Sequence, residues 1–134
     1  MWLGDLTAEQ RTTLMRLAYN VMVSDGLLDP GEEGMLAELR REMSVPADVE
    51  IDYQELSGIE GIFAERRARL IAVLNLLRVS YADGAFEIEE ECLLKEVCNR
   101  FELTDRDFLL LDNWVRRWIV LREDAEQLLD SSAA

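Results

Sequence analysis

The sequence predicts an all-α protein, a bundle of about six to seven helices made of two pseudo-symmetric helix–turn–helix halves. Three observations support this class. Apolar residues form 49% of a 134-residue chain that has only two prolines and seven glycines, which favours a helical core over a β-sandwich. Apolar residues recur at helical spacing between recognisable caps. A 33-residue stretch also repeats along the chain. We expect one domain covering residues 1–134.

The first two helices have clear start signals. Thr7 and Gln10 form a capping box, so the first helix is expected to begin near Ala8 and to end at the turn around Gly26. It is apolar on most sides, which predicts a position in the middle of the bundle. The second helix is expected after Asp29, with Pro30 at its first position. Its single apolar face is typical of an outer helix.

The second half follows the same plan. Residues 47–62 are mixed and predict one short helix, after which a long apolar helix runs from about Phe63 to the Asp83-Gly84 turn. Glu87 stands at the next N-cap position. Thr104 caps a last helix that reaches about Leu129, where Trp114 and Trp118 share one face and are expected to pack in the core.

An internal repeat relates the two halves. When the sequence is shifted by 58 positions, residues 14–46 align with residues 72–104 without a gap, and seven of the 33 pairs are identical, where chance gives about two. The identical pairs are Val21/Val79, Asp25/Asp83, Gly26/Gly84, Glu32/Glu90, Glu33/Glu91, Leu36/Leu94 and Glu38/Glu96. Each half therefore predicts a helical hairpin whose turn is built in the same way.

Charge and residue usage exclude several classes of function. With 28 acidic against 14 basic residues the net charge is −14, which disfavours nucleic acid and anionic membrane surfaces and favours cations and basic proteins. The chain has no histidine, the usual general base and zinc ligand, so we expect no enzyme. Cys92 and Cys98 lie six apart on one expected helix and cannot form a disulfide without unwinding it. We interpret both as small core residues.

The sequence also bears on the location of the protein and on its surface charge. No signal peptide opens the chain, and the most apolar stretch is too short to span a bilayer. These features predict a cytoplasmic protein without direct membrane insertion. Arg66, Arg67 and Arg69 predict a solvated basic face, with docking of an acidic partner as the alternative.

The two acidic turns resemble half of an EF-hand calcium loop, because both contain D-G followed by Glu six residues after the glycine. The other half is missing. If Gly26 is the sixth position of such a loop, then Val21 and Val23 occupy the first and third ligand positions, and aliphatic side chains cannot supply the oxygens that Ca²⁺ requires. The EF-hand interpretation therefore fails on ligand chemistry.

Helix capping explains part of the turns, and two interpretations stay open. Glu32 at the third position of a helix satisfies free backbone amides. Asp25 and Asp83 instead stand in the last turn of a helix, where a carboxylate meets the negative end of the helix dipole at a cost of about 0.3–1 kcal/mol. Either local hydrogen bonds or an arginine offset this cost, or a cation or partner does.

The same residues resemble those of the tellurite-resistance TerB-like family. The resembling segments are VMVSDGLLDPGEEGMLAEL and LRVSYADGAFEIEEECLLKEV, each with Glu seven residues after the Asp of the turn. The resemblance implies a non-enzymatic, cytoplasmic all-α domain associated with tellurite resistance and stress response. It also implies a metal site. Carried over by position, the ligands are Asp25 and Glu32 in the first half and Asp83 and Glu90 in the second.

We therefore expect the twin turns to present carboxylates to a divalent cation. Oxygen ligands without histidine or thiolate suit Ca²⁺, Mg²⁺ or Mn²⁺ better than Zn²⁺. The alternative is a metal-free interaction module or scaffold that binds a protein partner or a second copy of itself. That alternative predicts an exposed apolar groove between the halves or around Trp114 and Trp118.

Overall fold

The computed structural model describes residues 1–24, 30–82 and 87–131. In these ranges it contains six α-helices, one short 3₁₀ helix and no strand, which confirms the predicted all-α class. The elements in chain order are η1 (Leu3–Asp5), α1 (Ala8–Met22), α2 (Pro30–Glu42), α3 (Ile59–Ile62), α4 (Arg66–Ala82), α5 (Ile88–Arg100) and α6 (Asp105–Ser131).

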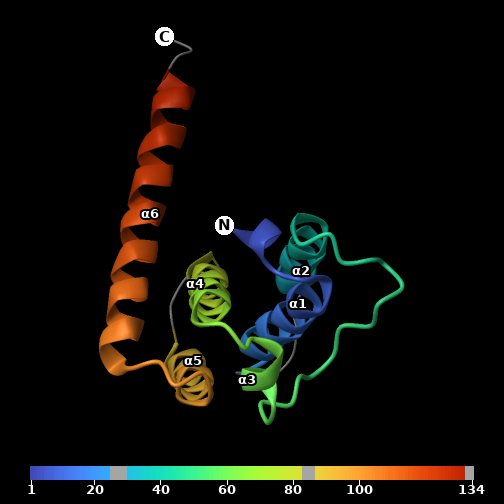
Figure 1. Cartoon of the computed structure of the whole chain (residues 1–134). Helices are drawn as coiled ribbons and strands as arrows, with labels where there is room; N and C mark the ends of the chain where they lie inside the picture. Colours follow the sequence, from blue (N-terminus) through green and yellow to red (C-terminus); the bar gives the residue numbers. More distant parts are fainter. Residues whose placement is uncertain (25–29, 83–86, 132–134) are drawn as a thin grey trace.

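Two central helices organise the bundle. Helices α1 and α4 lie next to each other, α2 packs on α1, and both α5 and α6 pack on α4 (Figure 1). Ten of the 17 residues of α4 and eight of the 15 residues of α1 are buried, as expected for helices that are apolar on most sides. Phe63 and Phe101 meet near one end of the core, with ring centroids 5.4 Å apart.

The helix starts follow the predicted caps. At α1, Gln10 N donates to Thr7 Oγ1 at 3.1 Å and Thr7 N donates to Gln10 Oε1 at 2.9 Å, which completes the capping box. Thr104 and Asp107 form the same reciprocal pair at the start of α6. Helix α6 then runs without a break to Ser131.

The sequence repeat reappears in the helix bounds. Shifting α2 by 58 positions gives residues 88–100, the bounds of α5, and shifting α1 gives 66–80, which lies within α4. This agreement concerns positions along the chain. The two-fold relation between the halves stays a prediction.

The repeated helices also end in the same way. Ser44 and Glu102, 58 positions apart, both have left-handed backbone, with φ of 55° and 58°. After α2, Val45 N donates to Arg40 O at 3.0 Å, and the equivalent bond after α5 measures 2.9 Å. This 6→1 bond, together with a buried apolar residue that follows the left-handed one, defines a Schellman motif.

The segment between the halves is irregular from Met43 to Gly58, and the predicted short helix in this region is limited to α3. Side chains of the first half hold the segment in place. The buried amide of Asn20 donates to Gln54 O at 2.9 Å and accepts from Gln54 N at 3.0 Å. Arg40 Nη1 donates to the carbonyls of Pro46 and Val49.

Arg69 joins three segments of the second half, so the expectation that it lies on a solvated face is wrong. Its guanidinium donates to Phe63 O at 2.6 Å, Glu60 O at 2.9 Å and Phe101 O at 3.0 Å. Glu60 belongs to α3, Phe63 lies between α3 and α4, and Phe101 directly follows α5. The Arg69 side chain is only half-exposed. Arg66 and Arg67, by contrast, are exposed as expected.

We predict that Arg69→Ala destabilises the protein by about 2–4 kcal/mol, because it leaves three partly buried carbonyls without their charged donor. Chemical denaturation measures this change. Arg66→Ala is the matched control on the same helix. It removes an exposed ion pair to Asp107 at 3.0 Å and should cost less than about 1 kcal/mol. Equal effects of the two substitutions would contradict the role of Arg69.

Candidate functional site

The predicted metal ligands fall partly outside the described residues. Asp25 and Asp83 lie in the ranges 25–29 and 83–86, which the structure does not describe. Glu32 and Glu90 are described, and both are buried, with 6% and 8% of their surface exposed. They occupy equivalent positions in the first turns of α2 and α5.

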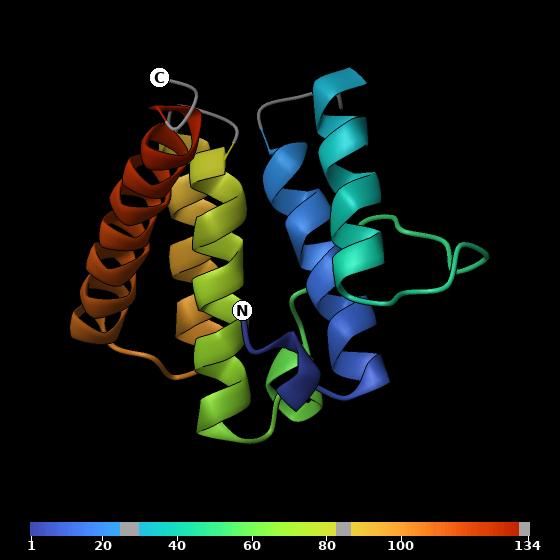
Figure 2. The same cartoon turned by 90° about the horizontal axis from the view of Figure 1, so that it is seen from above.

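Helix ends place the two glutamates at one end of the molecule. Helices α1 and α4 finish at the same end at which α2 and α5 begin (Figure 2). Glu90 has the predicted capping role, since its Oε1 accepts from Glu87 N at 3.3 Å. In the described ranges, no three acidic or cysteine side chains are grouped closely enough to hold a metal. The four-residue ligand set therefore stays a prediction.

Cysteine chemistry bears on the type of metal. Cys98 is buried as expected, and burial raises the pKa of its thiol to about 12. A thiol that stays protonated at neutral pH is a poor metal ligand. Cys92 is exposed, so the expectation that it is a core residue is wrong.

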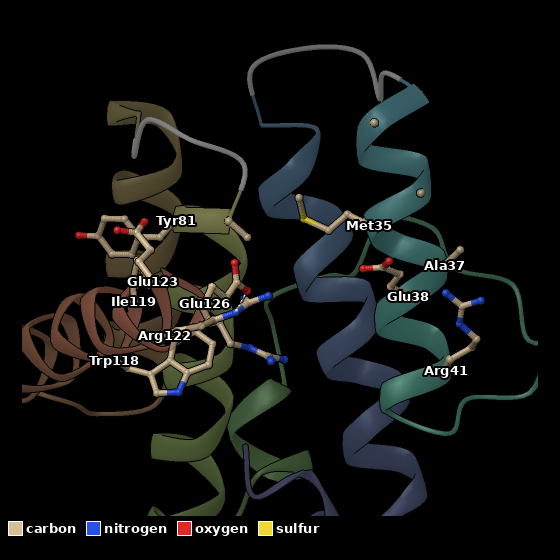
Figure 3. A pocket seen from close by; sticks show the side chains of 14 residues that line it. Met35, Ala37, Glu38, Arg41, Tyr81, Trp118, Ile119, Arg122, Glu123 and Glu126 are labelled. Carbon is tan, nitrogen blue, oxygen red and sulfur yellow. Dashed lines mark ion pairs between the residues drawn. The ribbon is translucent and has the colours of Figure 1, made fainter. Parts of the chain in front are cut away.

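A groove of about 900 Å³ lies beside this end of the molecule, between α2 and α6. Figure 3 shows Met35 and Glu38 of α2 on one side and Trp118, Arg122 and Glu126 of α6 on the other. Arg78, Tyr81 and Ala82 of α4 complete the lining. The groove therefore separates the first helical hairpin from α6, and its floor belongs to the second hairpin.

Small residues on α2 widen the groove. Gly31 and Gly34 both line it, and a methyl group built on Gly34 would meet no atom within 4 Å. Glycine inside a helix costs about 1 kcal/mol relative to alanine. Gly34 is therefore not needed for close packing inside the chain, and it leaves the surface of α2 open at this position.

Charges along the groove are partly paired. Arg78 Nη2 lies 2.8 Å from Glu42 Oε1, an ion pair at the floor, and Arg122 Nε lies 3.5 Å from Glu126 Oε1 on the α6 wall. Apolar contact surface comes from Met35, Trp118 and Ile119, so the groove alternates apolar and charged side chains. This lining suits an amphipathic protein segment.

One buried carboxylate fixes α6 against α4 next to the groove. Tyr81 Oη donates to Asp112 Oδ1 at 2.6 Å, and Arg116 Nε lies 2.8 Å from Tyr81 Oη and 3.1 Å from Asp112 Oδ2. The Asp112 side chain is only 10% exposed. Burial, followed by the bond to Asp112, raises the pKa of Tyr81 above its ordinary value of 10.0.

Asp112 and the groove glycines were not predicted from the sequence, although the sequence contains a signal for each. Asp112 falls between Phe108 and Val115 on the packed face of α6, where a carboxylate needs a donor. Gly34 stands inside a helix without any turn to explain it. Trp114 is half-buried against Trp2, with ring centroids 5.8 Å apart, so its predicted packing is only partial.

The described residues and the composition define an acidic, all-helical protein. No helix among the described residues has the length and apolar character to cross a membrane. The model of the family described as "Tellurite resistance protein TerB" matches residues 48–113, which confirms the resemblance to the TerB-like family. No curated protein and no solved structure is significantly similar to the chain.

The matched range covers only one of the two acidic turns. It contains Asp83 and Glu90 of the second half, whereas Asp25 and Glu32 of the first half lie outside it. The first turn resembles the second through the internal repeat of the sequence and the corresponding bounds of α2 and α5.

We predict that Tyr81→Phe destabilises the protein by about 1–2 kcal/mol, because Asp112 loses a hydrogen bond to a buried charge. Tyr53→Phe, at a side chain that is 62% exposed, should change stability by less than about 0.5 kcal/mol. Urea denaturation of both variants measures the difference. A neutral Tyr81→Phe would show that Arg116 alone balances Asp112.

The Tyr81–Asp112 pair also affects how the stability of the protein depends on pH. A raised folded-state pKa means that Tyr81 contributes stability below the ordinary value of 10.0, and that this contribution is lost as pH rises through its folded pKa. Tyr81→Phe should therefore show a smaller alkaline loss of stability than the wild type. Cys98 titrates in both proteins and cancels in the comparison.

Proposed function

We propose that this chain is a non-enzymatic TerB-like protein whose acidic turns bind a divalent cation. The observation that carries the proposal is the burial of Glu32 and Glu90 at the same register of α2 and α5, each seven residues after the aspartate of a D-G turn. Carboxylate oxygens suit a hard divalent cation. The same spacing in both halves would let each glutamate and its aspartate contribute oxygen ligands to one cation.

Ligand chemistry supports a hard cation. The chain has no histidine, and the raised pKa of Cys98 keeps that thiol protonated. Carboxylate oxygens are the remaining strong ligands, and these suit Ca²⁺, Mg²⁺ or Mn²⁺. The absence of histidine also supports a non-enzymatic role, and the family description supports a role in tellurite resistance.

We predict that Ca²⁺ or Mn²⁺ raises the melting temperature of the wild type, by an amount that grows with cation concentration as the folded state is bound. Asp25→Asn combined with Asp83→Asn should abolish the increase. Asp48→Asn combined with Asp52→Asn is the control, because it removes the same charge from exposed positions. A wild type whose melting temperature is unchanged by Ca²⁺, Mg²⁺ and Mn²⁺ would contradict the proposal.

The groove favours a second candidate function, a metal-free interaction module. It combines an apolar lining with charged side chains on both walls, and it includes Trp118, one of the two tryptophans around which an apolar groove was predicted. Under this proposal an amphipathic segment of a partner protein lies between α2 and α6. Binding would then be insensitive to chelators, which separates it from the first proposal.

Gly34 offers a direct test of the groove. Gly34→Leu places a side chain in open space inside the groove, so we predict that it blocks partner binding while leaving the fold intact. Gly34→Ala is the control, since both changes should raise stability by up to about 1 kcal/mol but alanine fills little of the groove. Co-purification from extract with each variant, with and without EDTA, measures the effect. Equal partner recovery with Leu and Ala would exclude the groove.

A further inference from the structure

Exposed apolar side chains are concentrated on α6. Of the nine large apolar residues that are exposed in the described ranges, six belong to this helix: Leu109, Leu110, Val120, Leu121, Leu128 and Leu129. Figure 1 shows α6 along one edge of the bundle, with α4 and α5 on one side of it. An apolar set of this size on the outer edge of a protein marks a contact surface.

Four of these residues share the outer face. Helix α6 packs inward through Phe108, Asp112 and Val115, at the spacing of one helical face. The pairs 109/110 and 120/121 point away from that face, and their side chains are between 55% and 67% exposed. Eleven residues make about three helical turns, so the two pairs lie one above the other along the helix.

The spacing of the two pairs is self-complementary. If a second α6 lies antiparallel and the helices cross at the level of Val115, each residue meets the one at an equal distance on the other side of that level. Leu109 then lies opposite Leu121 of the second copy, and Leu110 lies opposite Val120. Leu109 and Leu110 of each copy thus cover Val120 and Leu121 of the other copy. The same contact occurs twice, as a two-fold interface requires.

The polar and charged residues follow the same symmetry. With the same crossing level, Arg106 lies opposite Asp124 of the second copy, and Asn113 lies opposite Arg117. All four side chains are exposed on α6. Two Arg106–Asp124 ion pairs would close the ends of a contact about 27 Å long, counted as 18 residues at 1.5 Å each.

We propose that this outer face of α6, formed by Leu109, Leu110, Val120 and Leu121 with Arg106 and Asp124, is the interface of a homodimer in which the two α6 helices pack antiparallel. The proposal does not depend on cation binding or on the groove. A parallel arrangement would place Arg106 against Arg106, so the charges select the antiparallel one. An anionic membrane is a poor occupant because the chain carries a net charge of −14.

We predict that the full chain dimerises with increasing concentration in analytical ultracentrifugation, and that charge exchange controls the dimer. Arg106→Asp should weaken it at least several-fold, since each ion pair becomes a repulsion. Asp124→Arg should weaken it for the same reason. The double variant Arg106→Asp with Asp124→Arg should restore wild-type dimerisation, because both pairs re-form with reversed sign and net charge is unchanged.

Asp48→Arg is the matched control for Asp124→Arg, since it changes the net charge equally at an exposed position in the segment that joins the halves. It should not weaken the dimer. Leu110→Ser with Leu121→Ser should abolish the dimer while the circular dichroism spectrum stays helical.

Three outcomes would overturn the proposal. One is a wild type that stays monomeric at every concentration, and another is a dimer that the double charge exchange fails to rescue. The third is a monomer that binds anionic vesicles through Arg106.

Discussion

The mutual burial of α1 and α4 is the constraint on which the rest of the structure depends. Each of these helices is apolar on most sides and would be unstable if it were exposed to water. Other helices must therefore cover each of them on several sides. The partners α2, α5 and α6 supply that cover. Some polar residues of these helices are buried as well, and hydrogen bonds offset part of the cost: Asn75 Nδ2 donates to Met1 O at 3.1 Å and to Ile71 O at 2.9 Å.

The two halves cover their central helices in different ways. After the second hairpin the chain continues into α6, which packs along α4 through the Tyr81–Asp112–Arg116 network. After the first hairpin it continues into an irregular segment fastened by Asn20 and Arg40. Helix α2 therefore has no long helix on its outer side, and the groove is the space that this inequality leaves.

Local signals made most of the fold predictable. The caps at Thr7, Glu87 and Thr104 placed helix starts to within a residue, because capping depends on neighbours a few positions away. Tertiary contacts were not predictable in this way. In the sequence Arg69 is one of three neighbouring arginines. Its partly buried position depends on contacts with the carbonyls of Glu60 and Phe63 and with that of Phe101, which lies 32 residues away. The ligand roles of Glu32 and Glu90 remain predictions that rest on their burial and register.

The long final helix passes through two environments. Near Phe108 and Val115 it is packed against the core, so opening those turns requires breaking tertiary contacts. From Asp124 to Ser131 every side chain is exposed, so burial of side chains contributes little to the stability of this part of the helix. The free energy of local unfolding is therefore expected to decrease along α6, from the packed turns near Val115 to Ser131. The far end of α6 is then expected to exchange its backbone amide protons faster than the turns near Val115.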